Sequence, residues 1–217
     1  MKKIKGVIFD LDGTLANTLP LCIQAFKNSI EPLAGRTLSD EEIIATFGPS
    51  EEGTIMELVP DHFDKGIASY LHFYESLHHT CQEPFSGIPE ILAALKREHI
   101  KIALVTGKGK HSTAISLRQF GMEGLFEIIE TGSITGPRKA DGIRDVLNRW
   151  NDFETQEVLY VGDAPSDIVA CKQVGIPVVA AAWAATAEPE KLIVLAPDRI
   201  FYNIDEFASW LQSSIER

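Results

Sequence analysis

The sequence has 217 residues and a formal net charge of −11 at pH 7, with 45% hydrophobic and 24% charged residues. This length is enough for one substantial core, or for a core domain with a smaller second domain, and the composition is that of an ordinary globular protein. The negative charge argues against nucleic acid and against an anionic membrane surface as partners, because both bind basic protein faces.

No targeting segment or membrane span is expected. The basic start at residues 1–5 is followed by a short apolar run at residues 7–9 before Asp10, too short for a signal peptide. No apolar run approaches the length that crosses a bilayer. The cysteines have wide spacings without a pattern, so we expect reduced thiols in a cytoplasmic protein.

Short apolar runs rich in β-branched residues predict the strands of a parallel sheet. In chain order they span residues 5–9, 101–105, 126–129, 158–161 and 177–181. Helical patterns lie between the later runs, at residues 88–99, 112–120, 140–150 and 166–174. This alternation is typical of an α/β fold, a doubly wound parallel sheet with a Rossmann-like core. Ligands bind at the carboxyl ends of the strands in such sheets.

Residues 16–85 interrupt the alternation with helical patterns only. Helices are expected at residues 19–33, 39–47, 51–59 and 62–79. Ser39 followed by Glu42 is a typical helix start. Eleven acidic side chains against Lys27, Arg36 and Lys65 give this stretch a net charge of −8. We therefore expect a Rossmann-like core made of residues 1–15 and 86–217, with a small all-helical domain, residues 16–85, inserted after the first strand.

Four motifs place polar side chains at or just beyond predicted strand ends. They are Asp10-Leu11-Asp12-Gly13-Thr14, Thr106-Gly107, the segment 136–142 with Lys139, and Gly162-Asp163 with Asp167. Each motif alone is weak evidence, because isolated strand-end acids and threonines are usually turn residues and an isolated lysine is usually a surface residue. The combination of all four in this order is unlikely to be a coincidence.

These residue types together suit phosphoryl transfer through an aspartyl phosphate. A carboxylate such as Asp10 can act as a covalent nucleophile. Mg²⁺, which prefers hard oxygen ligands such as Asp10 and Asp163, would screen the repulsion between that carboxylate and a phosphate ester. Lys139 and the Thr106 hydroxyl could contact the phosphoryl oxygens, and Asp12 could carry protons to and from the leaving group and water.

On these motifs the chain resembles the haloacid dehalogenase-like hydrolase superfamily, in its phosphoglycolate phosphatase-like branch. The resemblance spans nearly the whole chain, including the helical insert, which stands where that branch carries its cap domain. It implies a Mg²⁺-dependent phosphatase that acts on a small phosphorylated metabolite.

The resemblance also implies a role for each motif residue. Asp10 would be the nucleophile and Asp12 the general acid/base. The phosphate would be bound by Thr106, Gly107 and Lys139. The Mg²⁺ ligands would be Asp10, the backbone carbonyl of Asp12, and Asp163, with Asp167 in a supporting shell.

The chain departs from the pattern of that branch in three places. Asn17-Thr18 replaces the usual Asp-Ser, and Lys139 is followed by Ala140-Asp141-Gly142 in place of Pro-x-Pro, which predicts a less rigid loop. Residues 108–111 are unusually basic and resemble a P-loop only superficially. We expect these basic residues near the phosphate.

Alternative functions remain open from the sequence. A phosphomutase of the same branch would return the phosphoryl group to a substrate. A phospho-accepting signalling module or a non-catalytic scaffold belongs to a different class of protein. The substrate and the oligomeric state do not follow from the sequence. Residues 47–51 are expected to reach the site from the helical insert, and the acidic insert suggests a preference for leaving groups without extra negative charge.

Overall fold

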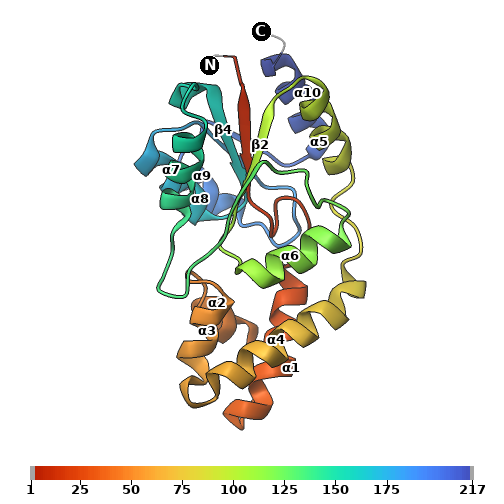
Figure 1. Cartoon of the computed structure of the whole chain (residues 1–217), viewed down its shortest axis with the longest axis vertical. Coiled ribbons are helices and arrows are strands. Elements are labelled where there is room, and N and C mark those ends of the chain that lie inside the picture. Colours follow the sequence, from red (N-terminus) through yellow and green to blue (C-terminus); the bar gives the residue numbers. More distant parts are fainter. Residues whose placement is uncertain (1–2, 216–217) are drawn as a thin grey trace.

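The structure is a computed structural model that describes residues 3–215 (Figure 1). Residues 1–2 and 216–217, which the sequence assigns to the core, lie outside the described part. A six-stranded sheet has the strand order β3-β2-β1-β4-β5-β6, and every neighbouring pair is parallel. The strands are β1 (Gly6–Phe9), β2 (Lys101–Val105), β3 (Ile128–Glu130), β4 (Val158–Gly162), β5 (Val178–Ala181) and β6 (Arg199–Phe201).

The doubly wound parallel sheet predicted from the sequence is confirmed. The first five strands match the predicted runs within about two residues at each end. Strand β6 has no counterpart among the predicted strands, because its three residues are too few to show a pattern. The chain order in the sheet brings the ends of β1, β2 and β4 next to one another, which is where three of the four motifs begin.

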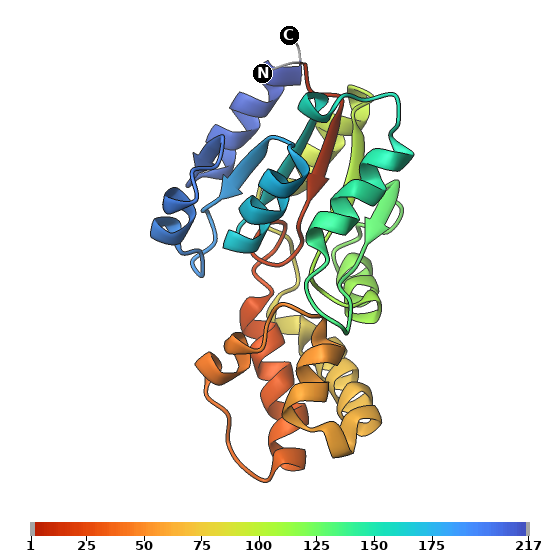
Figure 2. The same ribbon diagram turned by 90° about the vertical axis from the view of Figure 1, so that its left-hand side faces the viewer.

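Helices cover both faces of the sheet (Figure 2). Successive side chains of a strand point to opposite faces, so Val7 and Phe9 belong to one hydrophobic cluster and Ile8 to the other. The first cluster includes side chains of α5 (Ile88–Arg97), α6 (Lys110–Gln119) and α10 (Ile204–Ile215). The second includes side chains of α7 (Lys139–Arg149), α8 (Pro165–Val174) and α9 (Pro189–Val194). Strand β1 is therefore buried on both sides, which holds the residues that follow it in place.

Residues 19–80 form a helical unit next to the carboxyl ends of the strands (Figures 1 and 2). Its helices are α1 (Leu19–Ala34), α2 (Asp40–Ala45), α3 (Glu51–Leu58) and α4 (Phe63–Leu77), with 3-10 turns at Pro60–His62 and His78–Thr80. They enclose a hydrophobic cluster of their own, in which Phe26, Tyr70 and Tyr74 are the largest side chains, and Ile115 of α6 joins it.

The four helices expected in this stretch are present, with differences at their ends. Helix α2 stops at Ala45, and α4 begins after the 3-10 turn that starts at Pro60. The predicted helix start at Ser39 is confirmed: the Ser39 hydroxyl accepts from the Glu42 amide at 3.1 Å, and the Glu42 carboxylate accepts from the Ser39 amide at 2.8 Å. None of the helices within residues 3–215 combines the length and the apolar character that a bilayer crossing requires.

The loops that follow β1 and β4 approach each other closely at Gly13. This glycine has a φ of +76°, and a Cβ atom built on it would lie 2.0 Å from Oδ2 of Asp163. A residue with a side chain would therefore be strained in its backbone and would also displace Asp163. Gly13 therefore allows the loop that follows β1 to pack against Asp163.

Substitution of Gly13 should cost more than backbone strain alone. Gly35 at the end of α1 has a similar φ of +67°, but a Cβ atom built on it would meet no atom of the described residues within 4 Å, so Gly35→Ala is a matched control. We expect Gly35→Ala to lower the free energy of unfolding by about 1 to 2 kcal/mol. Gly13→Ala should lower it by at least about 1 kcal/mol more, because Asp163 must move. Denaturant-induced unfolding measures both values, and equal losses would contradict the close approach.

Candidate active site

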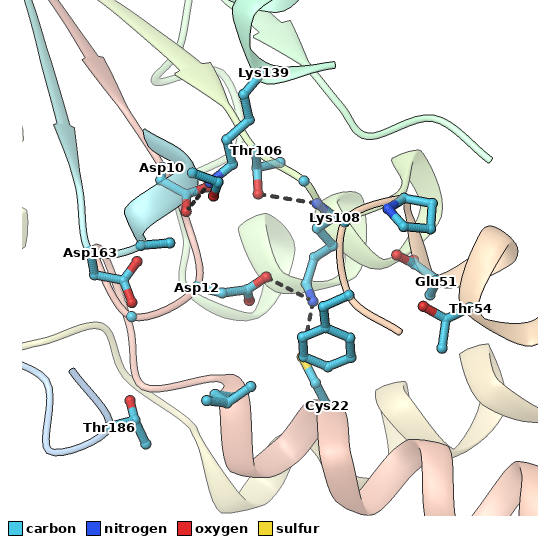
Figure 3. Close-up of a pocket in the computed structure, with 18 of the residues that line it drawn as sticks. Asp10, Asp12, Cys22, Glu51, Thr54, Thr106, Lys108, Lys139, Asp163 and Thr186 are labelled. Atoms are coloured by element: carbon cyan, nitrogen blue, oxygen red, sulfur yellow. Dashed lines mark hydrogen bonds and ion pairs between the residues drawn. The ribbon is translucent and has the colours of Figure 1, made fainter. Parts of the chain in front are cut away.

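A cavity of about 290 Å³ lies between the carboxyl ends of β1, β2 and β4 and the helical unit (Figure 3). Its wall includes all but one of the predicted site residues: Asp10, Asp12, Thr106, Gly107, Lys139 and Asp163. Asp167, the remaining one, lies fully buried behind the wall, in contact with Lys139. Four motifs that are far apart in the sequence thus meet around one cavity.

Asp10 follows β1 directly and is held by the sheet. Its amide donates to the carbonyl of Val161 at 2.9 Å, which continues the pairing of β1 with β4. The carboxylate is buried, with Oδ2 at 2.9 Å from Nζ of Lys139 and Oδ1 without a hydrogen-bond partner among the described residues. Burial raises the pKa of Asp10 to about 6, although Lys139 partly opposes this. A buried carboxylate oxygen without a partner calls for a cation or a ligand.

Lys139 stands in the first turn of α7 and joins two carboxylates. Its Nζ lies 2.9 Å from Asp10 and 2.6 Å from Oδ1 of Asp167. Burial alone would lower the pKa of Lys139, but the two neighbouring carboxylates raise it above its usual value. The side chain therefore carries a fixed positive charge at the bottom of the cavity.

Asp167 has its hydrogen-bonding capacity largely filled. Besides Lys139, the Tyr160 hydroxyl lies 2.8 Å from Oδ1, and the Ala164 amide donates to Oδ2 at 2.9 Å. This local bond to Ala164 also fixes the start of α8, the helix on which Asp167 lies. Asp167 is thus a rigid partner that orients Lys139.

The acidic group at this edge of the sheet suits a hard divalent cation. Ligand atoms of Asp10, Asp163 and Asp167 all lie within 4.8 Å of one another. Asp10 offers an oxygen without a partner, and Asp163 has one long hydrogen bond, from the Thr14 hydroxyl to Oδ1 at 3.2 Å. Burial raises the pKa of Asp163 well above its usual value, and the nearby Asp10 carboxylate adds to this. Because the oxygens of Asp167 are already engaged, Asp10 and Asp163 fit direct ligands and Asp167 fits a supporting position.

The side chain of Asp12 points away from that acidic group, toward the helical unit (Figure 3). One carboxylate oxygen accepts a short hydrogen bond from the hydroxyl of Thr18, the residue before α1, and the other lies 3.2 Å from Nζ of Lys108. The resemblance implies that the backbone carbonyl of Asp12 is a metal ligand and that its side chain is the acid/base. A side chain that points away from the acidic group is compatible with both roles.

Thr106 and Gly107 form the part of the wall that follows β2. The Thr106 amide donates to the carbonyl of Glu130 at 3.0 Å, and its hydroxyl accepts from the Lys108 amide at 3.3 Å. The loop after β3 comes very near: a Cβ atom on Gly132 would lie 1.9 Å from the carbonyl oxygen of Gly107. The loops that follow β2 and β3 therefore pack together without room for a side chain at Gly132.

Within the basic stretch at residues 108–111, which the sequence predicts near the phosphate, Lys108 is the basic residue that lines the cavity. It is 6% exposed, its Nζ lies 3.2 Å from Asp12 and 3.2 Å from Sγ of Cys22, and it stands 4.5 Å from the ring centre of Tyr74. Burial opposes its charge, but Asp12 and the other neighbours raise its pKa well above the usual value. Lys110 and His111, which share its basic stretch, are exposed and do not line the cavity. The sequence thus points to the basic stretch as a whole and does not single out Lys108.

Residues 47–51 reach the cavity from the helical unit, in agreement with the expectation from the sequence. Phe47, Gly48, Pro49 and Glu51 line it. Glu51 is 7% exposed and spans the two parts of the molecule: its carboxylate accepts from the Gly109 amide at 2.6 Å and from the hydroxyl of Ser112, both at the start of α6. Burial raises the pKa of Glu51, although Lys108 opposes this. The start of a helix favours a negative charge, so Glu51 fastens the helical unit to the core.

Comparison with known proteins agrees with this arrangement. The family model described as haloacid dehalogenase-like hydrolase matches residues 7–181. A protein of Listeria monocytogenes serotype 4a (strain HCC23) named pyrophosphatase PpaX is 31% identical over 199 residues, which are 90% of this chain and 91% of that protein.

Solved structures share the fold over nearly the whole chain. A haloacid dehalogenase-like family hydrolase from Streptococcus pneumoniae, SP0104, has a TM-score of 0.76 at 24% identity and covers 95% of this chain and 98% of its own. A protein from Haemophilus somnus 129pt described as a predicted phosphoglycolate phosphatase has a TM-score of 0.79 at 22% identity and covers 96% and 98%. With its family model matched over most of its length and its motifs gathered at one cavity, this chain belongs to the haloacid dehalogenase-like hydrolase family.

Proposed function

We propose that this protein is a Mg²⁺-dependent phosphatase that hydrolyses the phosphate monoester of a small metabolite through an aspartyl phosphate on Asp10. The observation that carries the proposal is the state of Asp10. It is a buried carboxylate that faces the cavity, with one oxygen on a fixed lysine and the other without a partner. Such a group is costly to keep unless a cation and a phosphoryl group complete it.

The chemistry would take two steps. In the first, the Asp10 carboxylate attacks phosphorus, the bond from phosphorus to the ester oxygen breaks, and Asp12 gives its proton to the leaving oxygen. In the second, Asp12 removes a proton from a water molecule, which attacks phosphorus and releases phosphate from Asp10. Thr18 and Lys108 support this role because they hold the Asp12 carboxylate on the side of the cavity that faces the helical unit.

The remaining site residues would stabilise the negative charge of the phosphoryl group. Lys139 and the Thr106 hydroxyl would contact its oxygens, with backbone groups near Gly107 as further donors. The residues that would hold Mg²⁺ are Asp10, Asp163 and the backbone carbonyl of Asp12, supported by Asp167. The ion when bound would neutralise charge on the nucleophile and on the phosphoryl oxygens.

The helical unit would act as a cap domain over this site. Residues 16–85 are proposed as the cap and residues 1–15 and 86–217 as the catalytic core. Support comes from the separate hydrophobic cluster of the helical unit and from its contribution to the cavity wall. All three cysteines are free thiols, which supports a cytoplasmic location as part of the same proposal.

A second candidate is hydrolysis of a phosphoric anhydride. It is favoured by the relative named pyrophosphatase PpaX at 31% identity. The same two steps would apply, with a phosphate in place of the alcohol as the leaving group. A phosphomutase would differ only in the group that accepts the phosphoryl from Asp10. A signalling role fits less well, because Asp12 lies at the site and would hydrolyse the phosphorylated form.

Replacement of Asp10 should abolish turnover. In Asp10→Asn the side chain is an amide, which is neither a nucleophile nor a charged metal ligand. Asp141→Asn is the matched control, because Asp141 is an exposed carboxylate on α7 paired with Arg144. Hydrolysis of p-nitrophenyl phosphate with Mg²⁺ should be lost in the first variant and retained in the second. Near-normal hydrolysis by Asp10→Asn would exclude the covalent mechanism.

Replacement of Asp12 should slow catalysis by roughly 10² to 10⁴-fold. In Asp12→Asn the leaving oxygen departs without a proton, so esters of alkyl alcohols should suffer more than p-nitrophenyl phosphate, whose leaving group needs little protonation. Single-turnover rates of phosphoryl transfer for the two kinds of ester give the comparison, since they exclude hydrolysis of the phosphorylated enzyme. Equal losses in these rates would count against Asp12 as the acid.

Activity should depend on Mg²⁺. Dialysis against a chelator should remove turnover, and added Mg²⁺ should restore it. Ca²⁺ should inhibit, because it takes more ligands at longer distances than Mg²⁺ and loosens the geometry. Steady-state assays with each cation test this, and full activity in excess chelator would refute the metal assignment.

A further inference from the structure

The helical unit gives the cavity an aromatic wall. The ring centre of Phe26 in α1 lies 6.0 Å from that of Phe47 and 4.4 Å from that of Tyr70. Phe26 and Tyr70 are buried, at 2% and 1% exposed, so Phe47 is the aromatic side chain of this group that is open to a ligand. Leu19 and Cys22 extend the wall along α1. Phe47 is 40% exposed although it is a large apolar side chain that lines a cavity. A ligand that covers it would remove this apolar surface from water.

While Asp12 is ionised, the same part of the wall offers no uncommitted positive charge among residues 3–215. Lys108 and Lys139 are the basic residues that line the cavity. Lys139 contacts Asp10 and Asp167, and Lys108 contacts Asp12. The carboxylate of Glu51 adds a negative charge on the side of the helical unit. A second anionic group on a substrate would therefore be buried without a cation of its own, which is unfavourable.

We infer that the leaving group is an uncharged alcohol or phenol with an apolar face that packs on Phe47, whose ring is supported by the buried Phe26. Substrates that carry a second anionic group in the leaving part, such as a carboxylate or another phosphate, are disfavoured. This inference rests on the proposed phosphatase function and specifies its substrate class. It separates this chain from the pyrophosphate substrate that the name of the relative PpaX indicates for that protein.

The inferred preference for uncharged leaving groups comes from the cavity wall and not from the overall charge of the helical unit. Acidic residues such as Asp40, Glu41 and Asp61 are exposed on its surface. Salt screens such charges within about 8 to 10 Å. The groups that decide are the aromatic wall, the paired Lys108, and Glu51, all of which face the cavity.

Two matched pairs of substrates test the inference on the wild-type protein with Mg²⁺. The first pair is phosphoglycolate and the phosphate monoester of glycolamide, which have the same size and differ by one charge. The second pair is benzyl phosphate and ethyl phosphate, which differ in apolar surface. We expect kcat/KM to be higher for the amide than for the carboxylate, and higher for benzyl than for ethyl, each by about tenfold or more. Pyrophosphate should be a poorer substrate than benzyl phosphate.

A pair of variants locates the effect. Phe47→Lys places a positive charge at the wall. It should bring the kcat/KM of phosphoglycolate closer to that of the glycolamide ester. Ile44→Lys is the control, because Ile44 is similarly exposed, at 43%, on the same part of the helical unit but does not line the cavity. Ile44→Lys should leave the ratio of the two kcat/KM values at the wild-type value. Assays at two salt concentrations separate a local effect from one that salt screens.

A failure of this inference can be told apart from a failure of the proposed phosphatase function. Absence of turnover with p-nitrophenyl phosphate and with all four esters, or turnover that survives Asp10→Asn, would overturn both. Robust Asp10-dependent turnover with phosphoglycolate or pyrophosphate as the preferred substrate would overturn this inference alone. Equal narrowing by Phe47→Lys and Ile44→Lys would also overturn it, since overall charge would then be the cause. The wild-type comparison decides the substrate class even if a variant does not fold.

Discussion

The contact of Lys139 with Asp10 and Asp167 is the interaction on which the rest of the site depends. Three carboxylates, Asp10, Asp163 and Asp167, meet at one edge of the sheet, and one lysine lies among them. Two negative charges would remain unbalanced if all three were ionised. Burial is the main cause of the raised pKa values of Asp10 and Asp163, and the neighbouring carboxylates add to it. A divalent cation has the charge that is needed.

The fold supports this arrangement by placing each charged group on a rigid element. Asp10 continues β1, which is buried on both faces, and Lys139 begins α7. Asp167 is held by Tyr160 from β4 and by the amide that starts α8. A lysine on a mobile loop would be screened by water and would lose much of its effect. The two basic residues of the cavity thus lie in different surroundings: Lys139 lies among the strand-end acids, and Lys108 lies at the boundary with the helical unit.

The sequence alone predicts the groups that lie at strand ends and the segments 47–51 and 108–111, but it misses the pairings that depend on distant contacts. Asp10, Thr106 and Asp163 could be predicted to meet because each follows a strand of one parallel sheet, whose carboxyl ends share an edge. Lys108 meets Cys22 across 86 residues, and Glu51 meets Gly109 across 58. These pairings depend on how the helical unit lies on the core, which no local pattern encodes. Strand β6 and helices α9 and α10 are missing from the prediction, and the shortness of β6 and α9 left little periodicity to detect.

Residues 47–51 are attached to the core at one end and present an exposed side chain, Phe47, at the other. The loop is anchored by the Ser50 amide, which donates to the carbonyl of Ser133 at 2.9 Å, and by the carboxylate of Glu51. The Phe47 side chain, at the other end of the loop, is 40% exposed and makes an aromatic contact with Phe26. Under the proposed function, exchange of that one side chain would change the cavity wall while the anchors and the acids stay in place. A point mutation at Phe47 would then change the range of leaving groups without a change in any residue proposed to react.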